Sequence, residues 1–426
     1  MSEKQPKKNK AFKFGAVPTD DQKKFFWDCF CARKFVWNKM LGDRMSGNFR
    51  VVHEDDIVDD MMSMFEISAV PEYIPITPAM YRKEFPWLNI VDSDALHCTK
   101  LDLNRAFREF YEQEKFKYSA KTLARCERQK RKPTFYELEK HPNFKSRKNT
   151  NWHSYTTHNR KSTKENYTIE IIDGKYIKLP KIGNVRIKMH RRIPKGYIIK
   201  SATISMTPDG KYNISVLTEY EETIKPVVID EYSEILGLDY SMPELYVNHN
   251  NDCPEFDKWY RNTQDKLARE QRKMSNMVFG SNNYAKQKLK IAKLHRKVAN
   301  QRKDFLHKES YSIAKNYDLV CAEDLDMKAM AQCLSFGKSV HDNGWGMFTT
   351  FLEYKLRDRG KHYIEIERSY PSSKLCHKCG WLYEDLKLDE RTWTCGGCGT
   401  FHYRDHNAAN NTRNRGIVLF KAQNAS

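Results

Sequence analysis

Hydrophobic positions near the start of the chain follow two different periodicities. Residues 11–19 form a short apolar run that Pro18 ends, as is typical of a strand. Apolar residues from Phe25 onward then recur near the spacing of one helix face, and Asp20 stands where a helix cap is needed. The pattern predicts a strand that leads into an amphipathic helix capped by Asp20.

The next segment, from 46 to about 140, has a mostly helical pattern that the proline-containing residues 71–81 interrupt. We expect a separate helical lobe there. Residues 115–150 hold 12 Lys or Arg against three Glu, with aromatic residues between them. This mixture suits a groove that follows phosphates and stacks bases. A solvated charged helix face is the alternative.

Residues 167–219 consist of short β-rich runs, separated by the turn signals DGK, KIG, IPKG and PDGK. Such hairpin signals predict a small antiparallel barrel or sheet. The strand at 11–17 has no nearby partner, so we expect it to pair with these later strands. One β domain would then close around an inserted helical lobe.

Strands and helices alternate in the second half of the chain. A strand, a turn and a second strand are expected in EILGLDYSMPELYVN, and two helices broken at GSNN carry 14 Lys or Arg against four acidic residues over 261–310. The strand DLVCAEDL, the helix MFTTFLEYKLRDRG and the strand HYIEIERSY follow. This alternation indicates an α/β domain.

Composition makes a polyanion the first partner to consider. The 426 residues include 74 Lys and Arg against 55 Asp and Glu, a net charge of +19, with 39% hydrophobic and 12% aromatic residues. The excess charge is therefore carried on folded surfaces. Nonspecific binding to RNA or membrane surfaces is the alternative. No apolar run approaches the roughly 18 residues of a membrane span, so we expect a cytoplasmic protein without membrane partners that acts on nucleoid-associated DNA.

Four of the 11 cysteines form two CxxC pairs that 15 residues separate, and the other seven are scattered. This spacing predicts a closed, structural zinc site, and a glycine after each pair permits the tight turns around the metal. A redox dithiol is disfavoured because two pairs are present. Three nearby histidines are expected to be spectators or nucleic-acid contacts. The cysteines are Cys376, Cys379, Cys395 and Cys398, and the histidines are His377, His402 and His406.

Three acidic residues, Asp239, Glu323 and Asp405, stand at the ends of expected elements. The first two follow apolar runs, and the ends of strands are where open α/β sheets hold their sites. Three convergent carboxylates would bind Mg²⁺ or Mn²⁺, and two such ions activate water for phosphodiester hydrolysis. Among 55 acidic residues, ordinary surface charges are the alternative.

The motifs LGLDYS, AEDLDM, YPSSKLCHKCG and WTCGGCGTFHYRDHNAANN, in this order, resemble the RuvC-type nuclease half of the TnpB (OrfB) family. These are transposon-encoded relatives of compact type V CRISPR effectors. FKFGAVPTDDQ and ARKFVWNKML are similar to the opening strand and helix of that family, and FKSRK and IKLPKIGNVRIK to its β-rich domain. The resemblance covers nearly the whole chain and is weakest over about 46–115.

This resemblance implies an RNA-guided DNA endonuclease whose partners are a guide noncoding RNA and target double-stranded DNA. It assigns catalysis and Mg²⁺ (or Mn²⁺) binding to Asp239, Glu323 and Asp405, and Zn²⁺ to the four cysteines. One departure is Ser241, where the family often has glycine in the turn after the first aspartate. The segment 327–346 is expected to be either a mobile lid over the site or a plain surface loop.

The implied fold is multi-domain α+β. It comprises a β-barrel-like wedge domain with an inserted helical recognition lobe, an RNase H-like (RuvC) α/β nuclease domain and a Cys₄ zinc-ribbon insertion. The expected divisions are 1–45 for the opening strand and helix, 46–140 for the recognition lobe, 141–230 for the wedge, 231–375 for the first part of the nuclease, 376–400 for the zinc ribbon and 401–426 for the C-terminal nuclease segment.

Three other readings stay open. A compact type V CRISPR effector differs mainly in where its guide RNA is encoded, and the short chain favours the transposon reading. An unguided RNase H-like transposase or resolvase would use the same chemistry without RNA. A nonenzymatic zinc-ribbon protein would bind nucleic acid without cleaving it. No oligomeric state follows from the residues.

Overall fold

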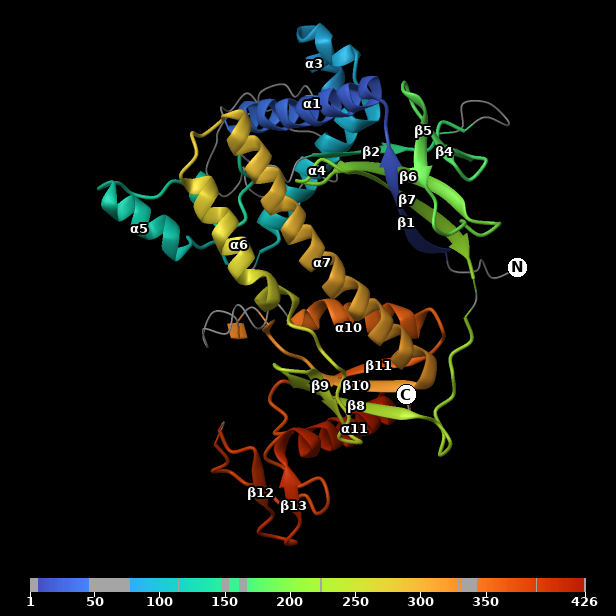
Figure 1. Ribbon diagram of the computed structural model, residues 1–426, viewed down its shortest axis with the longest axis vertical. Coiled ribbons are helices and arrows are strands. Elements are labelled where there is room, and N and C mark those ends of the chain that lie inside the picture. The colour runs from blue at the N-terminus through green and yellow to red at the C-terminus, as the bar shows by residue number, and fades with distance from the viewer. Residues whose placement is uncertain are drawn as a thin grey trace, which may run out of the picture. The chain divides into compact units, whose positions relative to one another are not determined.

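A computed structural model gives the fold as two compact units, Met1–Glu222 and Thr223–Ser426 (Figure 1). In the described part of the chain, no helix is both long enough and apolar enough to cross a membrane. The described residues are 7–45, 77–113, 115–146, 153–160, 167–222, 224–327, 329–330, 343–387 and 389–424.

The first unit is built on a seven-stranded antiparallel sheet with the order β2-β6-β7-β1-β5-β4-β3. The opening strand lies inside this sheet, where it pairs with β7 on one side and β5 on the other. The expectation that it joins the later strands is therefore confirmed. The strands are β1 (Lys7–Val17), β2 (Ser154–His158), β3 (Glu170–Ile172), β4 (Tyr176–Leu179), β5 (Gly183–Lys188), β6 (Ile198–Met206) and β7 (Tyr212–Glu221).

The sheet curls so that its two edges approach each other. The Thr168 amide, just before β3, donates to the Arg160 carbonyl, just after β2, at 3.0 Å. The Ile169 amide donates to Asn159 Oδ1 at 2.9 Å. These bonds join the segments beside the edge strands, although β2 and β3 share no ladder. The sheet is thus curled, as the barrel-like prediction requires, without a continuous ladder around it.

The first four of the helical elements given at the end of this paragraph share with the sheet a core of buried aromatic and aliphatic side chains. Thr19, rather than Asp20, caps the first helix: its hydroxyl accepts from the Gln22 amide at 3.3 Å, and Gln22 Oε1 accepts from the Thr19 amide at 3.1 Å. The Asp20 cap was wrong, because this reciprocal box needs Gln22 three residues later. Residues 46–76 lie outside the described part. The elements are α1 (Asp20–Met45), α3 (Pro78–Glu84), η1 (Pro86–Asn89), α4 (Ser93–Tyr111), α5 (Ala120–Arg128) and η2 (Phe135–Glu137).

The second unit contains a four-stranded mixed sheet with the order β11-β10-β8-β9. β10 runs parallel to both β8 and β11, and β9 returns antiparallel to β8. This arrangement confirms the α/β character expected from the alternation of strands and helices. The strands are β8 (Ile235–Ser241), β9 (Leu245–Asn248), β10 (Leu319–Glu323) and β11 (His362–Ile366).

Helices cover both faces of this sheet. Leu236 and Leu238 of β8 join a core with α7 and α10, whereas the alternate residue Ile235 packs toward Ile417 and Phe420 of α11. The sheet therefore forms the middle layer of three. The helices are α6 (Trp259–Ser275), α7 (Asn282–Asn316), α10 (Trp345–Arg357) and α11 (Arg404–Asn424).

A buried carboxylate holds the α6–α7 hairpin together. Glu270 accepts hydrogen bonds from Gln287 at 2.8 Å and from Lys290 at 2.9 Å. These two bonds lower the pKa of Glu270 to about 2, since both favour the charged form. These bonds of Glu270 explain how two strongly basic helices stay packed side by side.

The cysteine segment forms a small ribbon with its own core. β12 (Thr392–Thr394) and β13 (Phe401–Tyr403) pair antiparallel, and Trp393 and Leu386 are buried with two of the cysteines. Since so few apolar side chains meet here, a metal would contribute much of the ribbon's stability.

Candidate carboxylate site and metal centre

Two of the three predicted carboxylates lie just beyond the ladder that joins two parallel strands. The ladder between β8 and β10 ends with Leu238 opposite Ala322. The next residues are Asp239 and Glu323, so their side chains follow at the same level of the sheet. Because side chains alternate along a strand, both carboxylates project on the face that α11 covers.

The third carboxylate is carried to this edge by α11, which lies directly against β8. A Cβ added at Gly237 would overlap the Ala409 carbonyl oxygen and stand 2.6 Å from Arg413 Cβ. Asp405 lies in the first turn of α11, four residues or about 6 Å before Ala409. Asp239 lies two residues, or about 6.6 Å, beyond Gly237 on the same face. Matching rises along the helix and the strand bring Asp405 near Asp239.

The electrostatics of Asp239 show that the three carboxyl groups are neighbours. Burial, and then the charges of Glu323 and Asp405, raise the pKa of Asp239 well above its ordinary value. The guanidinium groups of Arg404 and Arg391 oppose this rise. A divalent metal close to this carboxyl group would favour its charged form.

The other two carboxylates have partners of their own. Burial raises the pKa of Glu323, and a hydrogen bond from the Ser372 hydroxyl partly offsets this rise. Asp405 lies 3.4 Å from Arg404 Nε and 3.6 Å from Arg391 Nη1. The three are not gathered into one coordination sphere: in the described ranges, only the cysteine quartet has three or more ligand atoms that all lie within 4.8 Å of one another.

Ser241, where the family often has glycine, needs no unusual backbone. It lies in β8 rather than in the following turn, is 4% exposed, and its hydroxyl donates to Glu244. Its φ is not positive, whereas Leu245, at the start of β9, has a φ of 82°. The backbone strain of this hairpin is therefore at Leu245, and serine fits position 241.

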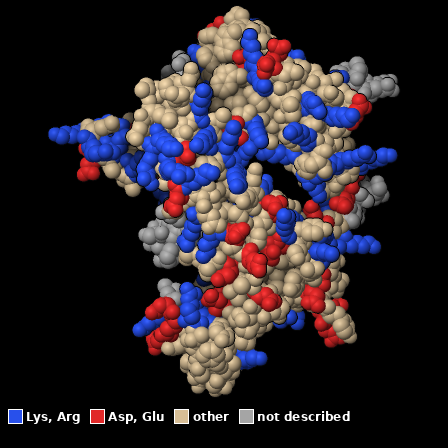
Figure 2. Space-filling model, in the orientation of Figure 1, with Lys and Arg blue, Asp and Glu red and all other residues tan. Residues whose placement is uncertain are grey.

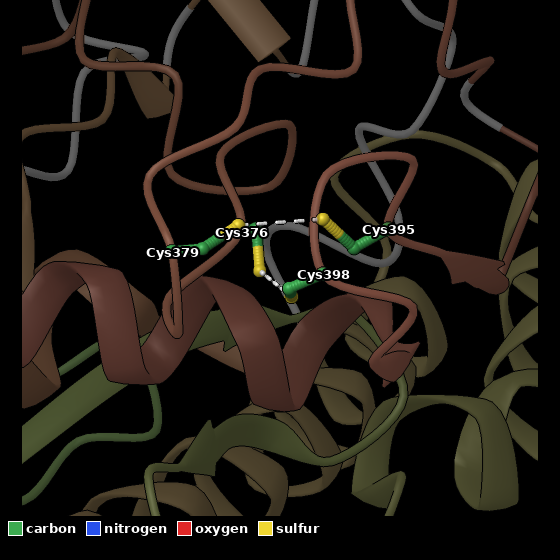
Figure 3. A group of neighbouring side chains, drawn as sticks. All are labelled: Cys376, Cys379, Cys395 and Cys398. Atoms are coloured by element: carbon green, nitrogen blue, oxygen red, sulfur yellow. Dashed lines mark hydrogen bonds between the residues drawn. The ribbon is translucent and has the colours of Figure 1, made fainter.

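Two loops of the zinc-ribbon segment direct the four cysteines toward one another (Figure 3). After each CxxC pair comes a glycine with a positive φ, 78° at Gly380 and 71° at Gly399. The amide of each glycine donates to the carbonyl of the first cysteine of its pair, Cys376 or Cys395, at 2.9 Å. The two turns are equivalent, as expected from the glycine positions.

The sulfur positions fit a tetrahedral metal. Sγ···Sγ distances are 3.7 Å between Cys376 and Cys398 and 3.5 Å between Cys379 and Cys395. Zn–S bonds of about 2.3 Å in a tetrahedron give sulfur separations of about 3.8 Å. Hydrogen bonds from Thr400 lower the pKa of Cys398, whereas burial and hydrogen bonds among the thiols raise the pKa of Cys379. The quartet could therefore hold zinc.

The histidines beside the quartet differ from one another. His402 is 3% exposed, lies opposite Trp393 in the ribbon, and has its Nε2 3.1 Å from Cys376 Sγ. Of the two alternatives, this burial beside the sulfur cluster favours the spectator for His402. His377 binds Asn407 Oδ1 through Nδ1 at 2.9 Å, and His406 Nε2 lies 2.9 Å from the His249 carbonyl oxygen.

Several residues that contact the site had not been singled out from the sequence. Arg391 and Ser372 touch the carboxylates directly, and Asn407 and Asn411 are buried on α11. The asparagines are four residues apart in a helix that carries Asp405 in its first turn, and this spacing places both on one helix face.

The α6–α7 hairpin presents most of its basic residues to solvent, in agreement with the charge count. Lys and Arg side chains are dense over these two helices in the view of Figure 2. Such a surface suits a phosphate backbone. The exposed basic residues are Arg261, Lys266, Arg269, Arg272, Lys273, Lys286, Lys288, Lys290, Lys293, Lys297, Lys303 and Lys308.

The basic segment of the first unit is only partly available. Phe116, Tyr136 and Phe144 are exposed among its lysines and arginines, as a stacking surface requires. However, Glu137 pairs with Arg125 at 2.7 Å and Arg131 at 2.6 Å. Residues 147–150, and most of the expected lid at 331–342, lie outside the described part of the chain.

Three family models match separate segments of the chain. A helix-turn-helix model of the OrfB family matches 8–46, a model described as "Probable transposase" matches 216–334, and a "Cas12f1-like, TNB domain" model matches 345–412. In the described part of the first match, the chain forms β1 and α1 rather than two helices. The second match contains Asp239 and Glu323, and the third contains Asp405 and the four cysteines.

Named relatives match much longer stretches. "Putative RNA-guided DNA endonuclease" from Streptomyces pristinaespiralis is 27% identical over 409 residues, 96% of this chain and 90% of that protein. "Putative RNA-guided DNA endonuclease InsQ" from Escherichia coli (strain K12) is 30% identical over 232 residues, 51% of this chain and 56% of that protein.

A solved structure of a Cas12f1-sgRNA-target DNA complex covers 96% of this chain and 99% of its own, with 13% identity and a TM-score of 0.46, a likeness too distant to carry a conclusion. The three family models match successive segments of the stretch that the Streptomyces relative covers almost completely. The chain is similar to the TnpB (OrfB) family along nearly its whole length.

Proposed function

We propose that this protein is an RNA-guided DNA endonuclease of the TnpB type that cuts double-stranded target DNA in the cytoplasm, beside a short flanking motif. The observation that carries the nuclease assignment is that Asp239 lies among the charges of Glu323 and Asp405 at the end of two parallel strands. Guidance by RNA is supported by the Streptomyces relative, whose name states that activity and which matches 96% of this chain.

The nuclease domain in this proposal is RuvC-type, with an RNase H-like fold. Its support is the order of elements in the second unit: an antiparallel β8–β9 hairpin, then parallel β10 and β11, and a final helix that begins beside the first strand's acid. The ladder between β8 and β10 fixes Asp239 and Glu323, and the contact of α11 with Gly237 fixes Asp405. These are the chain's own contributions to catalysis.

Asp239, Glu323 and Asp405 would hold Mg²⁺ or Mn²⁺, because hard carboxylate oxygens suit these cations. When bound, such ions supply the charge that activates a water and stabilises the leaving oxygen of a phosphodiester. Burial and mutual repulsion of the carboxylates disfavour three bare negative charges, so this group fits a cation better than an empty site. The four cysteines, by contrast, would hold a structural zinc, since a filled Cys₄ set leaves no open position.

The ribbon beside the site suits an unpaired strand. Phe401 and Tyr403 are 57% and 58% exposed and alternate with the buried His402, so both rings lie on one face of β13. Tyr403 comes two residues before Asp405. Exposed aromatic rings stack on bases of single strands without regard to sequence. A nucleic-acid strand held on these rings would contact residues that directly precede Asp405 in the sequence.

The basic surfaces would bind the guide RNA and its heteroduplex with DNA. The exposed lysines and arginines of α6 and α7 neutralise phosphates without reading bases. Sequence choice is then left to base pairing with the guide, while the protein recognises helical shape and a short flanking motif. Binding should weaken as salt rises, because counterion release drives it.

The deciding experiment pairs one protein preparation with two guide RNAs and two target DNAs. We expect Mg²⁺-dependent cleavage only in the two matched combinations. Cleavage that ignores the guide, or that survives removal of RNA by RNase, would contradict the proposal and favour an unguided resolvase. Tight binding without any cleavage would favour a nonenzymatic zinc-ribbon protein. The guide's genomic origin, in a transposon or a CRISPR array, is read from RNA that copurifies with the expressed locus.

A further inference from the structure

A short strap of chain, 372–377, is tied to α11 by two buried amide side chains. Asn407 and Asn411 are 0% and 2% exposed. Asn411 Nδ2 donates to the Ser372 carbonyl at 2.8 Å, and Asn407 Nδ2 donates to the Leu375 carbonyl at 2.8 Å. Asn407 Oδ1 accepts from the His377 amide at 3.0 Å. Helix and strap therefore satisfy each other's buried polar groups.

The two ends of this strap reach the two candidate metal sites. At one end, the Ser372 hydroxyl donates to Glu323 Oε1, and Ser372 is 7% exposed. At the other end, Cys376 is the first ligand of the cysteine quartet, and it is 1% exposed. α11 itself carries Asp405 two residues before Asn407. A single hydrogen-bonded unit thus joins the zinc ribbon to two of the three carboxylates.

We infer that Ser372 is a positioning residue for Glu323, and that the strap makes the carboxylate site depend on the zinc ribbon. The inference rests on the proposed function, because it concerns the metal site of that reaction. With zinc bound, Cys376 fixes one end of the strap, and Asn407 and Asn411 fix its backbone. The Ser372 hydroxyl is then held toward one carboxylate oxygen of Glu323.

The physical reason is that a carboxylate binds metal best when its rotamer is already fixed. The Ser372 bond holds one oxygen of Glu323, so less free energy is lost on ordering this side chain when a metal binds. Partners that orient a metal ligand in this way are worth roughly 10- to 100-fold in metal affinity. If the ribbon lost its zinc, the strap would keep its asparagine contacts but lose its anchor at Cys376.

The test measures Mn²⁺ affinity by the electron paramagnetic resonance of free Mn²⁺, in the full-length protein without nucleic acid. Binding at the carboxylates is defined as the part that Asp239→Ala abolishes. We expect Ser372→Ala to weaken this binding about 10- to 100-fold, and Ser372→Thr, which keeps the hydroxyl, to restore it. Ser373→Ala, its neighbour on the strap, should change nothing. Zinc content should be the same in all three variants.

The second arm removes zinc while keeping the carboxylates. Cys379→Ser takes away an exposed ligand, and we expect about one zinc per chain to be lost and Mn²⁺ affinity to fall about tenfold or more. Hydrogen exchange over β8 and β10 checks that the sheet stays folded. Wild-type Mn²⁺ affinity in Ser372→Ala overturns the positioning role, and wild-type affinity in zinc-free Cys379→Ser overturns the coupling. Neither readout needs RNA, so a protein that failed the guided-cleavage assay would refute the proposed function alone.

Discussion

Replacing Gly237 with alanine tests whether the close approach of α11 to the sheet brings Asp405 to Asp239. Gly237 is buried in the middle of β8, and its missing side chain leaves room for α11. A new Cβ would overlap the Ala409 carbonyl oxygen and stand 2.6 Å from Arg413 Cβ. Neither atom is the end of a flexible side chain, so the helix must move.

The size of this movement follows from the contact distances. Ordinary van der Waals contact begins near 3.4 Å, so the contact with Arg413 Cβ alone falls short by about 0.8 Å. Overpacking of this kind costs about 1–3 kcal/mol of unfolding free energy. A misplacement of about 1 Å at a reacting geometry costs about 100-fold in rate. We expect Gly237→Ala to lose stability and cleavage rate by these amounts.

Single-turnover cleavage and hydrogen exchange of the β8 and β10 amides measure the two effects separately. Gly15→Ala is the matched control, because it makes the same change in a central strand of the other unit, where the new Cβ meets only Lys188 Cβ at 4.0 Å. Its unfolding free energy should stay within about 0.5 kcal/mol of wild type. If Gly237→Ala cleaved DNA at the wild-type rate with unchanged exchange, the packing of α11 would not be what sets the site.

Three further outcomes are expected. Alanine at Asp239, Glu323 or Asp405 should abolish cleavage while leaving RNA binding intact in a gel-shift assay, because only metal ligands are lost; normal cutting by any of the three would refute the assignment. Freshly purified protein should contain about one zinc per chain by elemental analysis, and Cys395→Ser should lose it and unfold the ribbon. The α6–α7 hairpin should weaken in acid: the lowered pKa of Glu270 contributes stability above its unfolded value of about 4.3, which is lost as pH falls toward about 2. Glu270→Gln should remove this acid transition, which hydrogen exchange of the hairpin amides measures.

The sequence alone predicts those features that depend on short-range spacing. Each CxxC pair and its glycine lie within a few residues, so the turn and the ligand set can be read directly. Asp239 and Glu323 each end an apolar run, which predicts carboxylates at strand ends without any tertiary information. The parallel pairing of β8 with β10 sets them side by side. It depends on the topology of the sheet and cannot be predicted from their separation of 84 residues in the sequence.

Other features depend on competition between neighbours or on packing. Thr19 and Asp20 are both good helix caps, and Gln22 decides between them by completing a reciprocal pair with Thr19. In β13 the usual pattern is reversed: Phe401 and Tyr403 face solvent while His402 is buried. Hydrophobicity alone would predict that Phe401 and Tyr403 are buried. Instead, the imidazole of His402 is buried beside the sulfur atoms of the cysteines.

The surroundings of Asp405 and Asp239 differ in how strongly they favour a negative charge. Asp405 lies in the first turn of α11, where the helix dipole favours a negative charge, and Arg391 and Arg404 lie within 3.6 Å of it. For Asp239, burial and the charges of Glu323 and Asp405 raise the pKa. The same two arginines oppose this rise. Burial and repulsion therefore act against the charged form of Asp239. A divalent cation would offset this repulsion and favour the charged form of Asp239, in competition with protons.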